Sequence, residues 1–237
     1  MSKILKELNL LGETIILGHR GAGGEKPENT LMGFRYALEL GVKAIELDIH
    51  LSLDGRMMVI HDDTVDRTTN GTGSVKEINS DELRSLDAGF GETIPFLEEV
   101  LDLYEEFNFT LFIEIKSFGC EKLLVELIKG RELYQKVVTI SFNHRIVKKV
   151  KELDGKMKTA CLIYGLPVNA VDIIESAKAD GLSISVSTVD QALVNLCHHH
   201  DYKVAVWNVN EKEKLAHFLK MGVDYIGTDF PSKVQLD

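Results

Sequence analysis

Short runs of β-branched and apolar residues recur along this chain, and stretches with the apolar spacing of a helix separate most of them. From Leu31 to Gly41, and again from Leu97 to Phe107, apolar residues repeat every three or four positions, as on the buried face of a helix. Strands that alternate with helices pair in parallel. Eight strands are predicted, from the runs TIIL at 14, AIELDI at 44, TLFIEI at 110, VVTI at 137, TACLI at 159, GLSISV at 181, KVAVW at 203 and DYIG at 224.

The spacing of these strands favours a closed barrel. Most begin 21 to 29 residues after the preceding one, which is the length of one βα unit. The interval between the second and third strands is longer and leaves an insertion of about 40 residues, near 53–93, that is rich in turn residues. We predict an α/β fold: a (β/α)8 TIM barrel forming one domain over residues 1–237. The insertion after strand 2 is predicted to be a small subdomain or a lid over one barrel end.

Composition and charge narrow the classes of function. The net charge of -10 opposes non-specific nucleic-acid binding, which needs basic patches, so no nucleic-acid partner is expected. No apolar run approaches the ~20 residues of a membrane span, and no signal peptide is recognisable. Residues Ile4 to Leu11 form a short amphipathic stretch that either touches a membrane or, as we favour, closes the bottom of the barrel.

The cysteines point to a reducing compartment. Cys120, Cys161 and Cys197 are odd in number, far apart and lack the spacing of zinc or redox motifs. We therefore expect a cytoplasmic protein, without stable membrane insertion and with a possible homo-oligomeric state.

The glycine-rich segment GHRGAGGEKPENT, residues 18–30, invites comparison with phosphate-binding loops. In a dinucleotide fingerprint the third glycine would fall on Lys26, and no adjacent Gly-Lys pair supplies a P-loop. What remains is a small-residue turn directly after the first strand. In a parallel barrel this is the carboxyl end, where active sites are assembled, and His19 and Arg20 lie there.

Acidic residues on the next two strands suggest a metal site. Glu46 and Asp48 are two positions apart on one strand, so they share a face, and so do Glu114 and Lys116 on the following strand. Converging carboxylates repel one another unless water or a cation lies between them. We predict an oxygen-only site for Mg²⁺ or Ca²⁺ formed by the three acids, with Lys116 beside it for an anionic ligand. The alternative is a set of strand-end charges paired with lysines on the barrel rim.

Some of the remaining histidines and the tryptophan are candidate site residues, and the others are not. His61, in MVIHDD, titrates near neutral pH and suits the proton transfers of phosphodiester cleavage. Trp207 ends the seventh strand and is expected to be core or an apolar wall for substrate. We assign no function to His50, His144 or His217, expected on the surface or in loops, nor to the CHHH run at 197–200, expected to be a solvated helix end.

With these residues in place, the chain strongly resembles the glycerophosphodiester phosphodiesterases. The resemblance covers nearly everything after Leu11 and is densest over 18–73, and weakest over 121–180. It is carried by GHRGAGGEKPENT, FRYALELGVKAIELDIHLSLDGRMMVIHDDTVDRTTNGTG, IPFLEEVL, FIEIK, VAVWNVN and GVDYIGTDFP. It implies a (β/α)8 barrel with the insertion after strand 2. It also implies hydrolysis of a small-molecule glycerophosphodiester to sn-glycerol 3-phosphate and an alcohol.

The resemblance also implies roles for individual residues. His19 and His61 resemble the acid/base pair, and Arg20 and Lys116 the phosphate contacts. The same comparison makes Glu46, Asp48 and Glu114 the metal ligands, and it places Glu28, Asn29 and Trp207 among the substrate-binding residues, the first two in the family's PENT element.

Two departures from the family pattern and two alternative functions accompany this prediction. Ser52 and Asn208 stand where threonine is usual, and neither is expected to touch the chemistry. The alternatives are a phospholipase-type barrel acting on lipid phosphodiesters, and a non-catalytic barrel that binds a glycerophosphodiester.

Overall fold

The computed structural model describes residues 14–234, so the predicted helix at Ile4 to Leu11 lies outside the described residues. The strands are β1 (Ile15–Gly18), β2 (Ala44–Leu51), β3 (Met57–Val59), β4 (Thr110–Ile115), β5 (Val137–Ser141), β6 (Lys158–Ile163), β7 (Gly181–Ser185), β8 (Lys203–Trp207) and β9 (Tyr225–Thr228). The helices are α2 (Leu31–Glu39), α3 (Ser80–Arg84), α4 (Leu97–Leu101), α5 (Glu121–Gly130), α6 (His144–Leu153), α7 (Ala170–Ala177), α8 (Gln191–His199) and α9 (Lys212–Met221), with 3₁₀ turns η1 (Val75–Glu77) and η2 (Asp102–Glu105).

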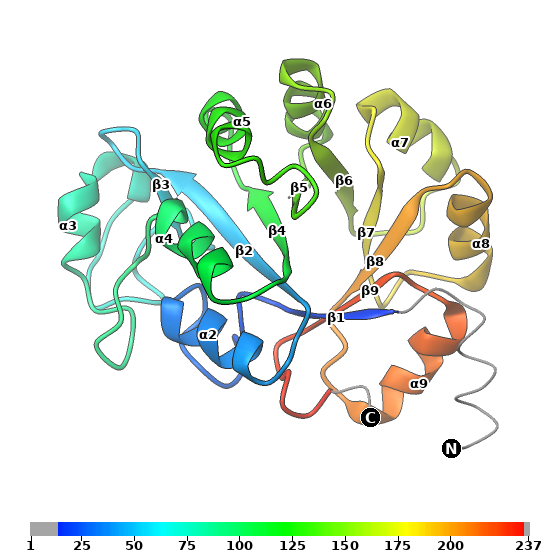
Figure 1. Ribbon diagram of the computed structural model, residues 1–237, viewed down its shortest axis with the longest axis horizontal. Helices are drawn as coiled ribbons and strands as arrows, with labels where there is room; N and C mark the ends of the chain where they lie inside the picture. Colours follow the sequence, from blue (N-terminus) through cyan, green and yellow to red (C-terminus); the bar gives the residue numbers. More distant parts are fainter. Residues whose placement is uncertain (1–13, 235–237) are drawn as a thin grey trace.

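Within residues 14–234, eight parallel strands close on themselves (Figure 1). β1 pairs in parallel with β2 on one side and with β9 on the other, and the remaining strands follow in chain order. All eight coincide with the apolar runs of the sequence. The predicted (β/α)8 barrel with an insertion after strand 2 is confirmed.

Apolar side chains form two layers, one between the strands and the helices and one inside the barrel. Ile45, Leu47 and Ile49 point outward from β2 and pack with helices α2 and α4. A smaller cluster inside the barrel includes Leu17 and Phe112. Because side chains alternate along a strand, the outward row of β2 leaves its other row to face the barrel interior. Polar residues in that inner row therefore face the barrel interior.

The segment between β2 and α4 has a small core of its own. β3 pairs antiparallel with the end of β2, and Met58, Val65 and Leu83 pack together among the buried residues of this segment. In Figure 1 it lies at the outer edge of the barrel, beside β2. The helix predicted from Leu97 is shorter than expected, because α4 ends at Leu101 and the chain continues as the tighter turn η2.

Over residues 14–234, none of the helices has the length and apolar character needed to cross a bilayer.

The outward face of β2 makes a first prediction about stability. Leu47 is fully buried, so Leu47→Ala leaves a cavity and is expected to lower the free energy of unfolding by about 2–5 kcal/mol. Urea unfolding followed by circular dichroism measures it. The control Leu123→Ala removes a side chain that is 41% exposed and should cost far less; equal losses would contradict the assigned packing.

The cysteines make a second prediction. All three thiols are unpaired and buried, and burial raises the pKa of Cys120 and Cys161 to about 12 and that of Cys197 to about 11. At pH 8 the folded protein therefore holds neutral, inaccessible thiols, and only the thiolate reacts with a disulfide reagent. We expect almost no reaction with Ellman's reagent until denaturant is added, when three thiols per chain should react. Rapid labelling of the folded protein would contradict this placement.

Candidate active site

A cavity of about 310 Å³ opens at the carboxyl ends of the barrel strands. One part of its wall is polar and charged, with His19, Arg20, Glu46, His61, Glu114 and Lys116. Another part is apolar, with Phe112, Phe142, Leu162 and Trp207 among its residues. A pocket with a few converging polar groups and an apolar wall, at this end of a barrel, is the usual form of an active site.

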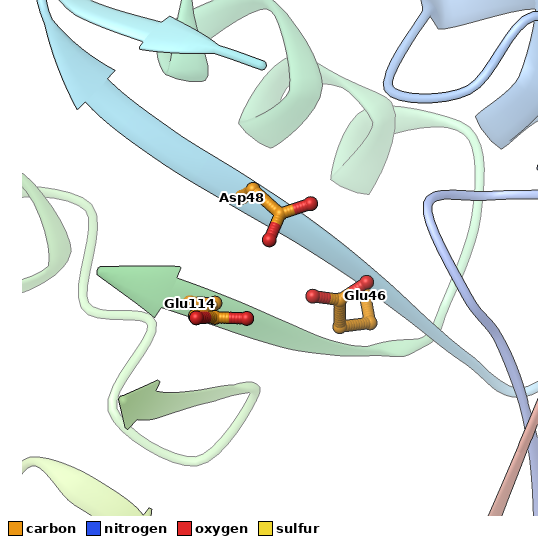
Figure 2. Close-up of side chains that lie close together, drawn as sticks. All are labelled: Glu46, Asp48 and Glu114. Carbon is orange, nitrogen blue, oxygen red and sulfur yellow. The ribbon is translucent and has the colours of Figure 1, made fainter. Parts of the chain in front are cut away.

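Three carboxylates converge at this cavity: Glu46 and Glu114 line it, and Asp48 is buried beside them. Glu46 and Asp48 come from the inner row of β2, and the backbone register places Glu114 of β4 directly beside Asp48 (Figure 2). Each offers an oxygen that lies within 4.8 Å of the oxygens of the other two, and all three residues are buried. The convergence predicted from the two strands is therefore present.

The charges in this group are only partly balanced. Burial and the neighbouring Asp48 raise the pKa of Glu46 to about 7, and the same two causes raise the pKa of Glu114 to about 8. Burial opposes the ionisation of Asp48 as well, but Lys116 and Arg20 outweigh it and lower its pKa. An oxygen-only set of buried anions suits a hard divalent cation such as Mg²⁺ or Ca²⁺. The residues present thus fit a metal ion.

Two cations border the carboxylates on the cavity side. Lys116 Nζ lies 3.0 Å from an oxygen of Glu114 and 3.4 Å from one of Asp48. Arg20 Nε lies 3.4 Å from the other oxygen of Asp48, and its backbone N–H donates to Glu46 at 3.1 Å. Both side chains line the cavity, so they are placed to meet an anionic ligand as well as the acids.

The glycines of the first loop allow a tight turn of the backbone. Gly21 has φ +82°, and a Cβ there would lie 2.7 Å from the carbonyl carbon of Gly33, which is closer than real contacts allow. The close approach packs the loop on the first turn of α2, where the Thr30 hydroxyl accepts from the N–H of Gly33. These glycines give room for the turn that presents His19 and Arg20 to the cavity.

His19 is held by residues from the far end of the chain. Its Nδ1 donates to Asp229 Oδ1 at 2.6 Å, which leaves Nε2 on the side of Glu46, 3.9 Å from that carboxylate. Burial alone would lower the pKa of His19, but Asp229 and Glu46 outweigh burial and raise it. The same hydrogen bond lowers the pKa of Asp229 to about 2, against the effect of burial.

His61 is anchored in the same way by its neighbour in sequence. Its Nδ1 donates to Asp62 Oδ1 at 2.6 Å. Burial lowers the pKa of His61, although Asp48 and Asp62 act in the opposite direction. Both histidines therefore have Nδ1 occupied by an aspartate, and in each ring Nε2 is the nitrogen that can exchange a proton with a bound molecule.

Two of the sequence-based expectations were wrong. His50 is not a surface or loop residue: it lies in β2, is 8% exposed, and its Nε2 donates to the carbonyl oxygen of His61 at 3.0 Å. Asn208 does touch the chemistry, since its Nδ2 lies 2.9 Å from His19 Nδ1 and donates to both oxygens of Asp229. β9 lies between β8 and β1, and the residues that follow β8 and β1 come into contact across its end.

Asp229 and Asp62 are functional candidates that sequence reasoning missed. A usable signal existed for both. Asp229 directly follows the last strand, which pairs with the first in a closed barrel, and Asp62 is adjacent to a histidine already singled out. A carboxylate in either position is well placed to orient an imidazole.

The predicted substrate contacts fall into two groups. Trp207 lines the cavity and meets Phe142 edge to face, with ring centroids 5.7 Å apart. Glu28 and Asn29 lie behind the cavity wall instead: Glu28 accepts from Arg20 at 2.9 Å, and Asn29 donates to Asp48 at 2.9 Å. Their contacts are with Arg20, which lines the cavity, and with Asp48, which is buried beside it.

A (β/α)8 barrel whose strand ends carry this set of acids, cations and histidines defines an enzyme. Residues 19–233 match the model of the glycerophosphoryl diester phosphodiesterase family. The chain belongs to that family.

Individual relatives agree with this assignment. A glycerophosphodiester phosphodiesterase of Caldanaerobacter subterraneus subsp. tengcongensis is 38% identical over 231 residues, covering 92% of this chain and 95% of the relative. Another from Bacillus altitudinis is 34% identical, covering 93% and 96%. Among solved structures, an Oleispira antarctica phosphodiesterase in complex with the product sn-glycerol-3-phosphate has a TM-score of 0.85 and 29% identity, covering 96% of each chain.

The carboxylate group makes a prediction about metal binding. Mg²⁺ or Ca²⁺ at about 100 times its dissociation constant should stabilise the wild type by about 2.7 kcal/mol, and Glu114→Gln should remove most of this effect. In chelator at neutral pH, Glu114→Gln should melt close to the wild type, because the pKa of about 8 leaves the Glu114 side chain mostly protonated. Thermal unfolding with and without metal measures both effects.

The control for this experiment is Glu126→Gln, which removes an exposed carboxylate paired with Lys122 and should keep the full metal response. A Glu114→Gln variant that still gains the wild-type increment on adding metal would contradict the assigned ligand.

Proposed function

We propose that this protein hydrolyses glycerophosphodiesters to sn-glycerol 3-phosphate and an alcohol in the cavity described above. One observation carries the proposal: two aspartate-anchored histidines, two cations and two of three converging carboxylates line a single cavity. The relative from Oleispira antarctica, solved with sn-glycerol-3-phosphate, supports the same product class.

Arg20 and Lys116 bind the phosphate in this proposal. The diester carries one negative charge, and attack on phosphorus adds another in the transition state. The guanidinium and the ammonium are already fixed by Asp48 and Glu114, so they meet the growing charge without first being reorganised.

Glu46, Asp48 and Glu114 hold the divalent metal, Mg²⁺ or Ca²⁺, in this proposal. When bound, it supplies Lewis-acid stabilisation of charge on the phosphoryl oxygens. Asn29 keeps Asp48 oriented by donating to one of its oxygens, and the backbone N–H of Arg20 does the same for Glu46.

His19 and His61 move the protons. One Nε2 accepts the proton of the attacking hydroxyl, which belongs to water or to the glycerol 2-position, and the other donates a proton to the leaving alcohol. Attack by the glycerol 2-hydroxyl gives a cyclic phosphate, which water then opens to glycerol 3-phosphate. Asp229 and Asp62 fix the tautomer of each ring by accepting from Nδ1. Trp207 provides an apolar wall beside the reacting groups.

The cellular setting is part of the same proposal. Three buried, unpaired thiols suit a reducing compartment, so we propose a cytoplasmic enzyme acting on a small-molecule substrate. A homo-oligomeric state stays a prediction.

The histidines make a prediction about activity. His19→Ala and His61→Ala should each lower kcat by about 10²–10⁴-fold, because each removes one proton-transfer group. Release of glycerol 3-phosphate from glycerophosphocholine, measured by a coupled assay, gives kcat. His217→Ala removes an exposed imidazole from α9 and should keep wild-type activity.

Three outcomes would contradict the proposal. Wild-type activity in both histidine variants would remove these residues from the chemistry, and binding of glycerophosphocholine without turnover would favour the non-catalytic alternative. Cleavage of lysophospholipid in vesicles, with no turnover of the water-soluble diester, would favour the lipid-specific one.

A further inference from the structure

One arginine of the insertion makes contacts that the proposed chemistry does not explain. Arg67 follows β3 and lies in the turn-rich part of the insertion. Its Nε and Nη2 donate to the two oxygens of Asp62 at 2.7 and 2.9 Å, and its Nη1 and Nη2 donate to the two oxygens of Glu28 at 2.8 Å each. The guanidinium is thus paired in fork geometry with two carboxylates at once.

Each of these carboxylates holds a different side chain of the cavity. Asp62 accepts from His61 Nδ1 at 2.6 Å through the same oxygen that accepts from Arg67 Nη2. Glu28 accepts from Arg20 Nη1 at 2.9 Å through the same oxygen that accepts from the Arg67 Nη2. A single carboxylate, that of Asp62, therefore separates Arg67 from the His61 imidazole. Another, that of Glu28, separates it from the Arg20 guanidinium.

The charges reinforce this arrangement. Arg67 lowers the pKa of Asp62, and hydrogen bonds from Arg67 and Arg20 lower that of Glu28 against the effect of burial. Both carboxylates therefore stay ionised as acceptors across the neutral pH range. A lysine has one ammonium and no planar fork, so it cannot make both paired contacts.

We propose that Arg67 is a positioning residue that holds His61 and Arg20 in a fixed relation across the cavity. The inference rests on the proposed function for its kinetic consequences. It also gives the insertion a role in the reaction: among the described residues of 53–93, His61 lines the cavity, and Arg67 ties its partner Asp62 to the first loop of the barrel.

The exposure of Arg67 makes it possible to distinguish a positioning role from a contribution to folding stability. Its side chain is 47% exposed, so solvent screens its ion pairs and limits what they contribute to folding. A purely structural role predicts a small loss of stability on mutation of Arg67, with kcat and KM little changed. A positioning role predicts a large loss of turnover in a protein that still folds, because small misplacements of reacting groups cost rate.

The test compares two arginine-to-lysine variants. Arg67→Lys should lower kcat for glycerophosphocholine by about tenfold or more and raise KM, since both the imidazole and the phosphate contact are loosened. Arg35→Lys is the matched control. Arg35 lies on α2, away from the cavity, and is 41% exposed. It also forms a fork with one carboxylate, that of Glu106. The Arg35→Lys variant should keep wild-type kcat and KM, and both variants should melt close to the wild type.

Two further measurements sharpen the test. Arg67→Ala should recover part of its activity in the presence of guanidinium ion, which restores the donors without the chain. The effects of Arg67→Lys and Asp62→Asn on kcat should be less than additive, because both act through His61. Equal losses in Arg67→Lys and Arg35→Lys, or a kcat and KM for Arg67→Lys within about threefold of wild type, would overturn the proposal.

A readout independent of turnover decides the matter if the wild type is inactive. Histidine ring ¹H–¹⁵N spectra should show the His61 signal changed in Arg67→Lys and unchanged in Arg35→Lys. An inactive wild type with this spectral change would overturn the proposed function and keep Arg67 as the residue that orients His61. An unchanged His61 signal in Arg67→Lys would overturn the positioning role.

Discussion

The interaction on which the site depends is the repulsion among three buried carboxylates. Glu46, Asp48 and Glu114 lie where the barrel excludes most water, so their charges cannot be screened by solvent. Lys116 and Arg20 balance part of this charge, and the raised pKa values of the two glutamates show that the balance is incomplete. A site arranged in this way favours a divalent cation and, through the adjacent cations, an anionic ligand.

The barrel imposes this arrangement by geometry. Alternation along β2 sends its apolar row outward to the helices and its acidic row inward, and the parallel register sets the acid of β4 beside that of β2. Closure of the sheet then brings β9 next to β1, so that Asp229 reaches His19 across the seam between the two ends of the chain. The scaffold thus positions groups that are separated by up to 210 residues.

Around the charged centre, the polar side chains fix one another in chains of hydrogen bonds. Each histidine is oriented by an aspartate, and Arg67 joins one of these pairs to the first loop. Such networks hold reacting groups more firmly than isolated contacts, because displacing one member breaks several charge-assisted bonds. The insertion after β2 therefore belongs with the active site as well as with the outer surface of the barrel.

The sequence by itself determined the eight strands, the insertion and the shared face of Glu46 and Asp48, because these follow from local periodicity. It also singled out His19 and His61 by type and by their place after apolar runs. Tertiary structure alone decided that His50 is buried in β2, that Asn208 touches His19, and that Arg67 reaches Glu28 of the first loop. Those contacts join loops whose relative positions depend on how the sheet closes and how the insertion folds back, and no local pattern encodes either.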